Sequence, residues 1–309
     1  MALMFYIAFR LVALLFTLAL FVPSPARAEE AKSQNGWISR ETHRIGGYQV
    51  ERSVNENAGE ERVTIRRGNA VLRVIGGERY KFGQRARAGY APEISVGADM
   101  TNDGIPDLLI EGFSGGAHCC FTHYVFSMGT EIHEIAELDT RDAGTTFRNV
   151  DGEPDLEALS ADVTFAYWYT SFAESPMPAI TFKYRDGHYR LAPDLMRAPQ
   201  ISEDELSEAA DEIVHSDRWG PPDPAYPNDP QMAANYEPRL WEVMLDLIYS
   251  GHYARAVLFF EQAWPEAQPG KEKFRYEFFE CQLRRSRYWS DIATMNGLEP
   301  LPPHADCPK

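Results

Sequence analysis

Residues 99–120 read DMTNDGIPDLLIEGFSGGAHCC, a polar, acidic loop that runs into an apolar strand-like segment and ends on two adjacent cysteines. Alternate side chains of such a loop aim oxygen atoms inward while the chain curls around a cation. In calcium loops of the D-x-D-x-D-G-x-x-D type, glycine at the sixth position permits the sharp turn. The predicted ligands here are the side chains of Asp99, Thr101, Asp103 and Asp107 and the carbonyl of Ile105.

The alternative is that residues 99–107 only form a turn, because Asp and Asn favour turns by bonding their own backbone. Three carboxylates at positions 1, 5 and 9 would repel one another in an empty loop, which favours an ion. Calcium takes about six to eight oxygen ligands, whereas magnesium needs a tight octahedron. The sequence therefore predicts Ca²⁺ as the cofactor.

The segment DMTNDGIPDLLI resembles the FG-GAP (VCBS) repeat family, whose signature is D-x-N-x-D-G-x-x-D-L, and departs from it only at Thr101. The resemblance implies a calcium loop between strands of a propeller-like blade. A second trace, FRNVDGEPDLEA, has Phe147 at position 1 and is expected to be degenerate and structural. Two repeats cannot close a propeller, so the resemblance implies only the calcium loop and its flanking strands in this chain and does not imply the full propeller fold. The family positions present in the second loop are Asn149, Asp151, Gly152 and Asp155.

Residues 37 to 193 have the alternating pattern and turn residues of β-strands. A helical period is missing between these segments, which favours a mainly antiparallel sheet. Hairpins are expected at 67–69, at 128–130 and at 186–187. The predicted strands lie within 46–54, 61–67, 70–76, 107–113, 122–128, 131–138, 163–172 and 180–192.

The pattern becomes helical near residue 200. Ser202 and Glu205 form a capping-box pattern, and the prolines of 219–231 mark a linker. Helices are expected over 240–248, 253–264 and 272–291. The predicted fold class is α+β, with a β-rich part that has propeller-blade-like strands and a small helical part. The predicted division is a signal peptide at 1–28, a β-rich domain at 29–198, a helix and linker at 199–238 and a helical domain at 239–309.

The helical hairpin near residue 251 resembles part of a tetratricopeptide motif. The match covers about half of one repeat, and a solenoid needs about three repeats. A packed helical tail is therefore favoured over a peptide-binding groove. The matching residues are Gly251, Tyr253, Ala256, Phe260 and Ala263.

The first 28 residues have an apolar run and an Ala-x-Ala ending, as in a secretory signal that is cleaved after Ala28. An uncleaved anchor is the alternative. Export predicts a periplasmic or secreted protein without stable membrane insertion. Without Arg10 and Arg27 the chain has 28 basic and 46 acidic residues, a net charge of −18. Such a charge disfavours nucleic acid and anionic lipid as partners.

The four cysteines favour disulfides in an exported chain, because oxidising compartments stabilise them. Three interpretations of the adjacent pair are open: a vicinal disulfide, two long-range disulfides, or a metal site with His118 and His123. The favoured arrangement is a local link within the pair and a second bond between the C-terminal cysteines. The disulfide candidates are Cys119, Cys120, Cys281 and Cys307.

The leading functional hypothesis is a non-enzymatic, calcium-stabilised protein that binds an envelope protein or a glycan. A hydrolase of an envelope polymer, with carboxylates near GFSGGAH as acid and base, is the alternative. A scaffold built on residues 231–309 is a third hypothesis. The aromatic residues of 163–172 suit either sugar stacking or an ordinary core, and the core is favoured: Tyr167, Trp168 and Tyr169.

Overall fold

The computed structural model describes residues 36–116, 119–221, 223–225 and 234–308, so the predicted signal peptide and part of the proline-rich linker lie outside the described residues. The strands form three four-stranded sheets, in each of which consecutive strands pair antiparallel. The predicted fold class, a β-rich α+β chain with C-terminal helices, is confirmed. The first sheet contains β1 (Trp37–Ile45), β2 (Tyr48–Asn55), β3 (Glu60–Arg67) and β4 (Ala70–Gly76). The second contains β5 (Arg79–Phe82), β6 (Asp107–Phe113), β7 (Phe121–Met128) and β8 (Ile132–Arg141), and the third β9 (Thr146–Arg148), β10 (Glu157–Ala161), β11 (Ala179–Arg185) and β12 (His188–Leu191).

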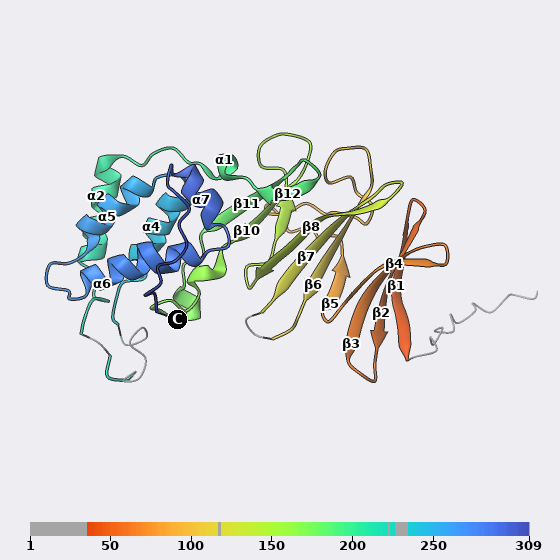
Figure 1. Cartoon of the computed structure of the whole chain (residues 1–309), viewed down its shortest axis with the longest axis horizontal. Helices are drawn as coiled ribbons and strands as arrows, with labels where there is room; N and C mark the ends of the chain where they lie inside the picture. The colour runs from red at the N-terminus through yellow and green to blue at the C-terminus, as the bar shows by residue number, and fades with distance from the viewer. Residues whose placement is uncertain (1–35, 117–118, 222, 226–233, 309) are drawn as a thin grey trace, which may run out of the picture.

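The three sheets follow one another along the long axis of the molecule, and the helices lie at the far end, beside the third sheet (Figure 1). The expected hairpins connect β3 to β4, β7 to β8 and β11 to β12. Loop 99–107 precedes β6, and loop 147–155 contains β9 at its start and precedes β10. Each loop therefore leads into the second strand of its sheet in chain order.

Two clusters of buried apolar side chains lie on opposite faces of the second sheet. Leu108 and Ile110 of β6 belong to the cluster shared with the first sheet, and Leu109 belongs to the cluster shared with the third sheet and the helices. Successive side chains of a strand point to opposite faces, so a strand that is covered on both sides has a continuous apolar run. This explains the DLLI sequence of β6. The larger cluster includes residues on both sides of residue 198.

Helix α2 begins with the predicted capping box, in which Ser202 and Glu205 bond each other's backbone amides. Helices α4 and α5 form the expected hairpin around Gly251. No described helix has the length and apolar character of a bilayer-spanning segment. The helices are α1 (Pro193–Met196), α2 (Glu203–Val214), α4 (Arg239–Tyr249), α5 (Tyr253–Ala263), α6 (Lys271–Tyr276), a π-helix (Glu277–Gln282), a 3-10 turn (Leu283–Arg285) and α7 (Trp289–Met295).

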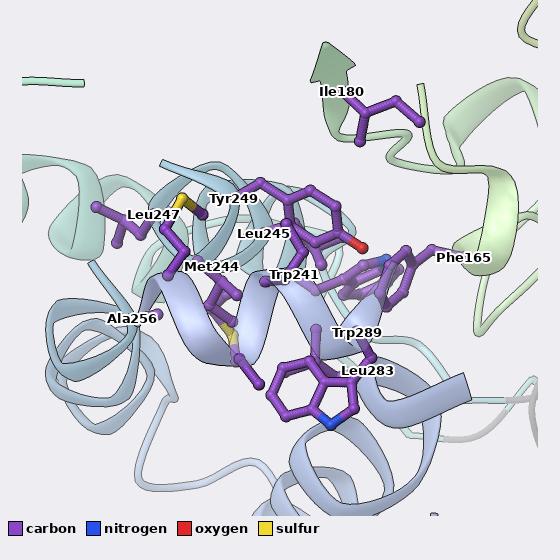
Figure 2. Packing of buried hydrophobic residues seen from close by; sticks show 14 of the residues in the cluster. Phe165, Ile180, Trp241, Met244, Leu245, Leu247, Tyr249, Ala256, Leu283 and Trp289 are labelled. Carbon is purple, nitrogen blue, oxygen red and sulfur yellow. The ribbon is translucent and has the colours of Figure 1, made fainter. Parts of the chain in front are cut away.

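The strand predicted over 163–172 is wrong. The segment forms two 3-10 turns, Val163–Phe165 and Phe172–Glu174, and two of its residues have positive φ, Tyr167 at 62° and Tyr169 at 56°. An alternating apolar run resembles a strand locally, but here the helices supply the burial. Trp168 and Tyr169 are buried as the core interpretation favoured, and Tyr167 is half exposed. The neighbouring Phe165 belongs to the same buried cluster as Trp241 of α4, and Figure 2 shows both side chains.

The single helix predicted over 272–291 is also wrong, because the chain leaves helical geometry at Ser286, where ψ is 132°. The Ser286 hydroxyl donates to Asp162, a buried carboxylate that also accepts a 2.6 Å hydrogen bond from Tyr249. Asp162 in addition caps the first 3-10 turn through the Thr164 amide at 2.9 Å. One buried carboxylate thus joins the irregular segment to α4 and to the helix break.

Candidate metal centre

Loop 99–107 curls tightly around its own carboxylates. Asp99 accepts hydrogen bonds from the amides of Asp103 at 3.2 Å and Gly104 at 2.9 Å, and Asp103 accepts one from Ile105 at 2.8 Å. Gly104 has φ of 82°, in the left-handed region that glycine adopts without strain. The turn predicted at this glycine is therefore present, and the carboxylates of Asp99 and Asp103 bond to backbone amides of their own loop.

Asp107 is the most unusual group of this loop, because it is 1% exposed and only half satisfied. Its Oδ2 accepts hydrogen bonds from the Met100 amide at 2.8 Å, the Thr101 amide at 3.1 Å and the Thr101 hydroxyl at 3.2 Å. Its Oδ1 has no donor among the described residues. Burial raises the pKa of Asp107 to about 6, against the hydrogen bonds that lower it. An unpaired buried carboxylate oxygen is costly, and a bound cation would satisfy it.

The oxygen atoms of the other predicted calcium ligands do not all point toward one common ion position. The Thr101 hydroxyl donates to Asp107 instead of facing open space. Across the described part of the chain, no three His, Cys, Asp or Glu side chains are arranged to hold a metal ion as they stand. An ion in this loop would therefore have to replace amide hydrogen bonds of Asp99 and Asp103. The donor set of hard oxygens fits calcium, which accepts flexible geometry.

Loop 147–155 holds a different cation, the ammonium group of Lys183 on β11. Its Nζ lies 2.5 Å from Asp151 Oδ2, 3.3 Å from Asp155 and 3.0 Å from Glu157. Burial lowers the pKa of Lys183, but its hydrogen bonds to these carboxylates outweigh that effect and leave the pKa above its ordinary value. The remaining position, Phe147, is fully buried in the core. Lys183 therefore supplies positive charge at the place where an ion would lie in this loop.

The first loop lacks such a built-in cation. Glu157 lies two residues after the ninth position of its loop, and the β10–β11 register places it opposite Lys183. The corresponding residue of the first loop is Leu109, and it pairs with Val125. Within the described residues, no lysine or arginine forms an ion pair with the loop's carboxylates. No sequence pattern pointed to Lys183, because its contact with the loop comes from the pairing of β10 with β11, which are separated by residues 162–178.

The two loops touch each other and share an acidic neighbourhood. The Leu156 amide donates to the Met100 carbonyl at 2.9 Å, and the Tyr189 hydroxyl donates to the Leu156 carbonyl at 3.0 Å. Burial raises the pKa of Tyr184, and the negative charges of Asp103 and Asp107 add to the shift. The first loop is therefore a locally negative site beside a loop whose negative charge Lys183 partly offsets.

The GGAHCC segment follows β6 and precedes β7 in the chain. Cys119 and Cys120 are joined to each other, as are Cys281 and Cys307, the arrangement that was favoured from the sequence. The Ser114 amide donates to the Cys120 carbonyl at 3.0 Å, and the Cys120 amide donates to the Ser114 hydroxyl at 2.8 Å. No described cysteine is free, so the alternative metal site has no thiolates. His118 lies outside the described residues.

The chain matches no known protein-family model, no curated protein and no solved structure.

Proposed function

We propose that this chain is an exported, calcium-stabilised binding protein whose partner is an envelope protein or a glycan. The observation that carries the calcium assignment is the buried, unpaired Oδ1 of Asp107 in a loop without its own cation. Lys183 supports it, because the sister loop needs a positive charge among the same kinds of carboxylate. The two disulfides are typical of an oxidising compartment outside the cytoplasm.

The residues that would hold the ion are those of the first loop. The bound ion supplies positive charge that offsets the repulsion between the carboxylates, and this chain's residues supply the oxygen shell. Binding to the folded state alone stabilises a protein by RT ln(1 + [L]/Kd), about 2.7 kcal/mol at a hundredfold excess over Kd. The ligands would be the carboxylates of Asp99, Asp103 and Asp107, the Thr101 hydroxyl and the Ile105 carbonyl.

Thermal unfolding of residues 29–309 tests the proposal directly. Millimolar calcium should raise the midpoint by about 5–10 °C over the metal-free protein, since 1 kcal/mol shifts the midpoint of such a chain by about 2–4 °C. Asp103→Asn should lose most of this rise. Asp151→Asn makes the same charge change in the second loop and should keep it. An unchanged midpoint in calcium, or an equal loss in both variants, would contradict the assignment.

The hydrolase alternative is not proposed, because the carboxylates beside segment 112–118 are divided by the second sheet. The Glu78 carboxylate lies where a Cβ on Gly112 would be, and it accepts a 3.1 Å hydrogen bond from Thr122. Glu111 belongs to the opposite face, because adjacent residues of a strand point to opposite sides. Glycoside hydrolysis requires two carboxyl groups that flank one bond.

Glu111 provides a pH test of this geometry. Its contacts with His123 and Lys81 outweigh burial and lower its pKa from 4.5 to about 2. A depressed carboxylate pKa stabilises the folded state above the unfolded value, and that stability is lost as the pH falls through the folded value. Glu111→Gln should therefore lower the free energy of unfolding at pH 7, by an amount that shrinks as the pH falls below about 4.5. Urea unfolding at several pH values measures the difference, and a deficit independent of pH would contradict the assigned contacts.

A further inference from the structure

A cleft of about 820 Å³ opens where the three sheets meet, along the edge strand β5. Its volume lies within the range of small-molecule sites, about 300–1,000 Å³. Every sheet contributes residues to the lining of the cleft, so the cleft forms only when the three sheets pack together. Glu41, Arg52 and Glu61 come from the first sheet, Glu111 and His123 from the second and Thr146 from the third.

The carboxylates that line this cleft already have cationic partners. Arg52 lies 3.5 Å from Glu41 and 3.1 Å from Glu61. Lys81 lies 2.9 Å from Glu111. These two cations contact all three carboxylates and offset two of their three negative charges.

Three more arginines line the cleft without a carboxylate partner among the described residues: Arg79, Arg85 and Arg87. A guanidinium group stays charged at all physiological pH values, and its planar fork matches carboxylate and phosphate oxygens. The cleft is thus locally positive on a chain whose formal net charge is −16. That contrast favours an anionic ligand at this place.

Two of these arginines stand on a hairpin, residues 84–94, that the fold holds in place. The Gln84 side chain donates to the Phe147 carbonyl and accepts from the Phe147 amide, both at 2.8 Å. Within the hairpin, the Arg87 amide donates to the Ala91 carbonyl at 2.9 Å. A Cβ on Gly83, at φ of 66°, would collide with the Ile94 carbonyl, so only glycine permits this close return. Such preorganisation reduces the entropy lost when a ligand binds.

His123 is a second, independent sign of a ligand site. It lines the cleft, its side chain is 3% exposed, and its Nδ1 has no hydrogen-bond partner among the described residues. Its other ring nitrogen lies 3.7 Å from Glu111. Buried polar atoms are rarely left without a partner, so Nδ1 is available to a polar group of a ligand or to a bridging water.

We propose that this cleft binds a small polyanion that carries two or more carboxylate or phosphate groups, held by Arg79, Arg85 and Arg87. The inference rests on the proposed role of the chain as a binding protein, and it does not rest on calcium. The proposal specifies the class of ligand that the chain binds and the cleft that binds it, and no residue of loop 99–107 lines this cleft.

Isothermal titration in metal-free, low-salt buffer tests the proposal with citrate and inorganic pyrophosphate as probes. We expect at least one of them to bind with a dissociation constant below about 1 mM, and the tighter one identifies carboxylate or phosphate as the preferred group. Triethyl citrate, which has the same skeleton without charge, should not bind. Arg85→Ala/Arg87→Ala should weaken binding about tenfold or more, because charge-assisted hydrogen bonds are lost.

The matched control is Arg44→Ala/Arg190→Ala, which removes two exposed arginines that lie outside the cleft. This variant should bind within about twofold of the parent chain, because neither arginine lines the cleft and neither can hydrogen-bond to a ligand there. Equal weakening in both double variants, or no binding of either anion at millimolar concentration, overturns the proposal. The Arg85→Ala/Arg87→Ala variant should keep its calcium-dependent midpoint, so a failure here is distinguishable from a failure of the calcium assignment.

Discussion

Replacing Lys183 with methionine should lower the free energy of unfolding by about 3–5 kcal/mol at pH 7, the usual cost of removing one partner from a buried ion pair. The Lys183 side chain is 13% exposed, and its ammonium group contacts three carboxylates, of which Glu157 is fully buried. Without it, these carboxylates repel one another at the start of β10. Urea unfolding of the variant and the parent chain in metal-free buffer measures the difference.

The control for this prediction is Lys273→Met. Lys273 is 56% exposed and lies 3.9 Å from a single carboxylate, so its removal should cost less than about 0.5 kcal/mol. Calcium should restore part of the stability lost in Lys183→Met, because the vacated position lies among the oxygens of Asp151, Asp155 and Glu157. If the two lysine variants were equally stable, Lys183 would not be the counter-charge of the second loop.

Replacing Asp162 with alanine should also cost about 3 kcal/mol or more, because hydrogen bonds to a charged group contribute about 1.5–3 kcal/mol each. The carboxylate is 2% exposed and accepts from the Tyr249 hydroxyl, the Ser286 hydroxyl and the Thr164 amide. Alanine would leave these donors without their acceptor inside the core. Chemical denaturation of Asp162→Ala against the parent chain measures the loss.

Asp194→Ala is the matched surface change for this test. Asp194 is 57% exposed, and its ion pair with Arg185 should contribute about 1 kcal/mol or less. Tyr249→Phe removes one donor and leaves the carboxylate in place, so its cost should lie between the two aspartate variants. A loss in Asp162→Ala no larger than in Asp194→Ala would show that the buried carboxylate does not anchor the irregular segment.

The two loops show how far a motif can be interpreted from sequence. The spacing of Asp99, Asp103 and Asp107 predicted a curled loop that opens a strand, and the fold places it there. The cation of the second loop is Lys183, which β11 supplies from more than 25 residues later in the chain. For the first loop, the equivalent position on the neighbouring strand β7 is Val125, which carries no charge. Motif spacing contains no information on such cross-strand partners.

The sequence by itself determined the antiparallel hairpins, the capping box at Ser202 and the helical hairpin around Gly251. These features depend on turn residues, caps and periodicity within a few neighbouring positions, so local patterns predict them.

The tertiary structure decided the irregular path of 163–172, the helix break at Ser286 and the cleft that all three sheets line. Each of these follows from burial and hydrogen bonding between segments far apart in the chain, such as Asp162 with Tyr249 and Gln84 with Phe147. Such long-range contacts outweigh local propensity, because an apolar or polar group that is buried must be packed or bonded wherever its partners lie.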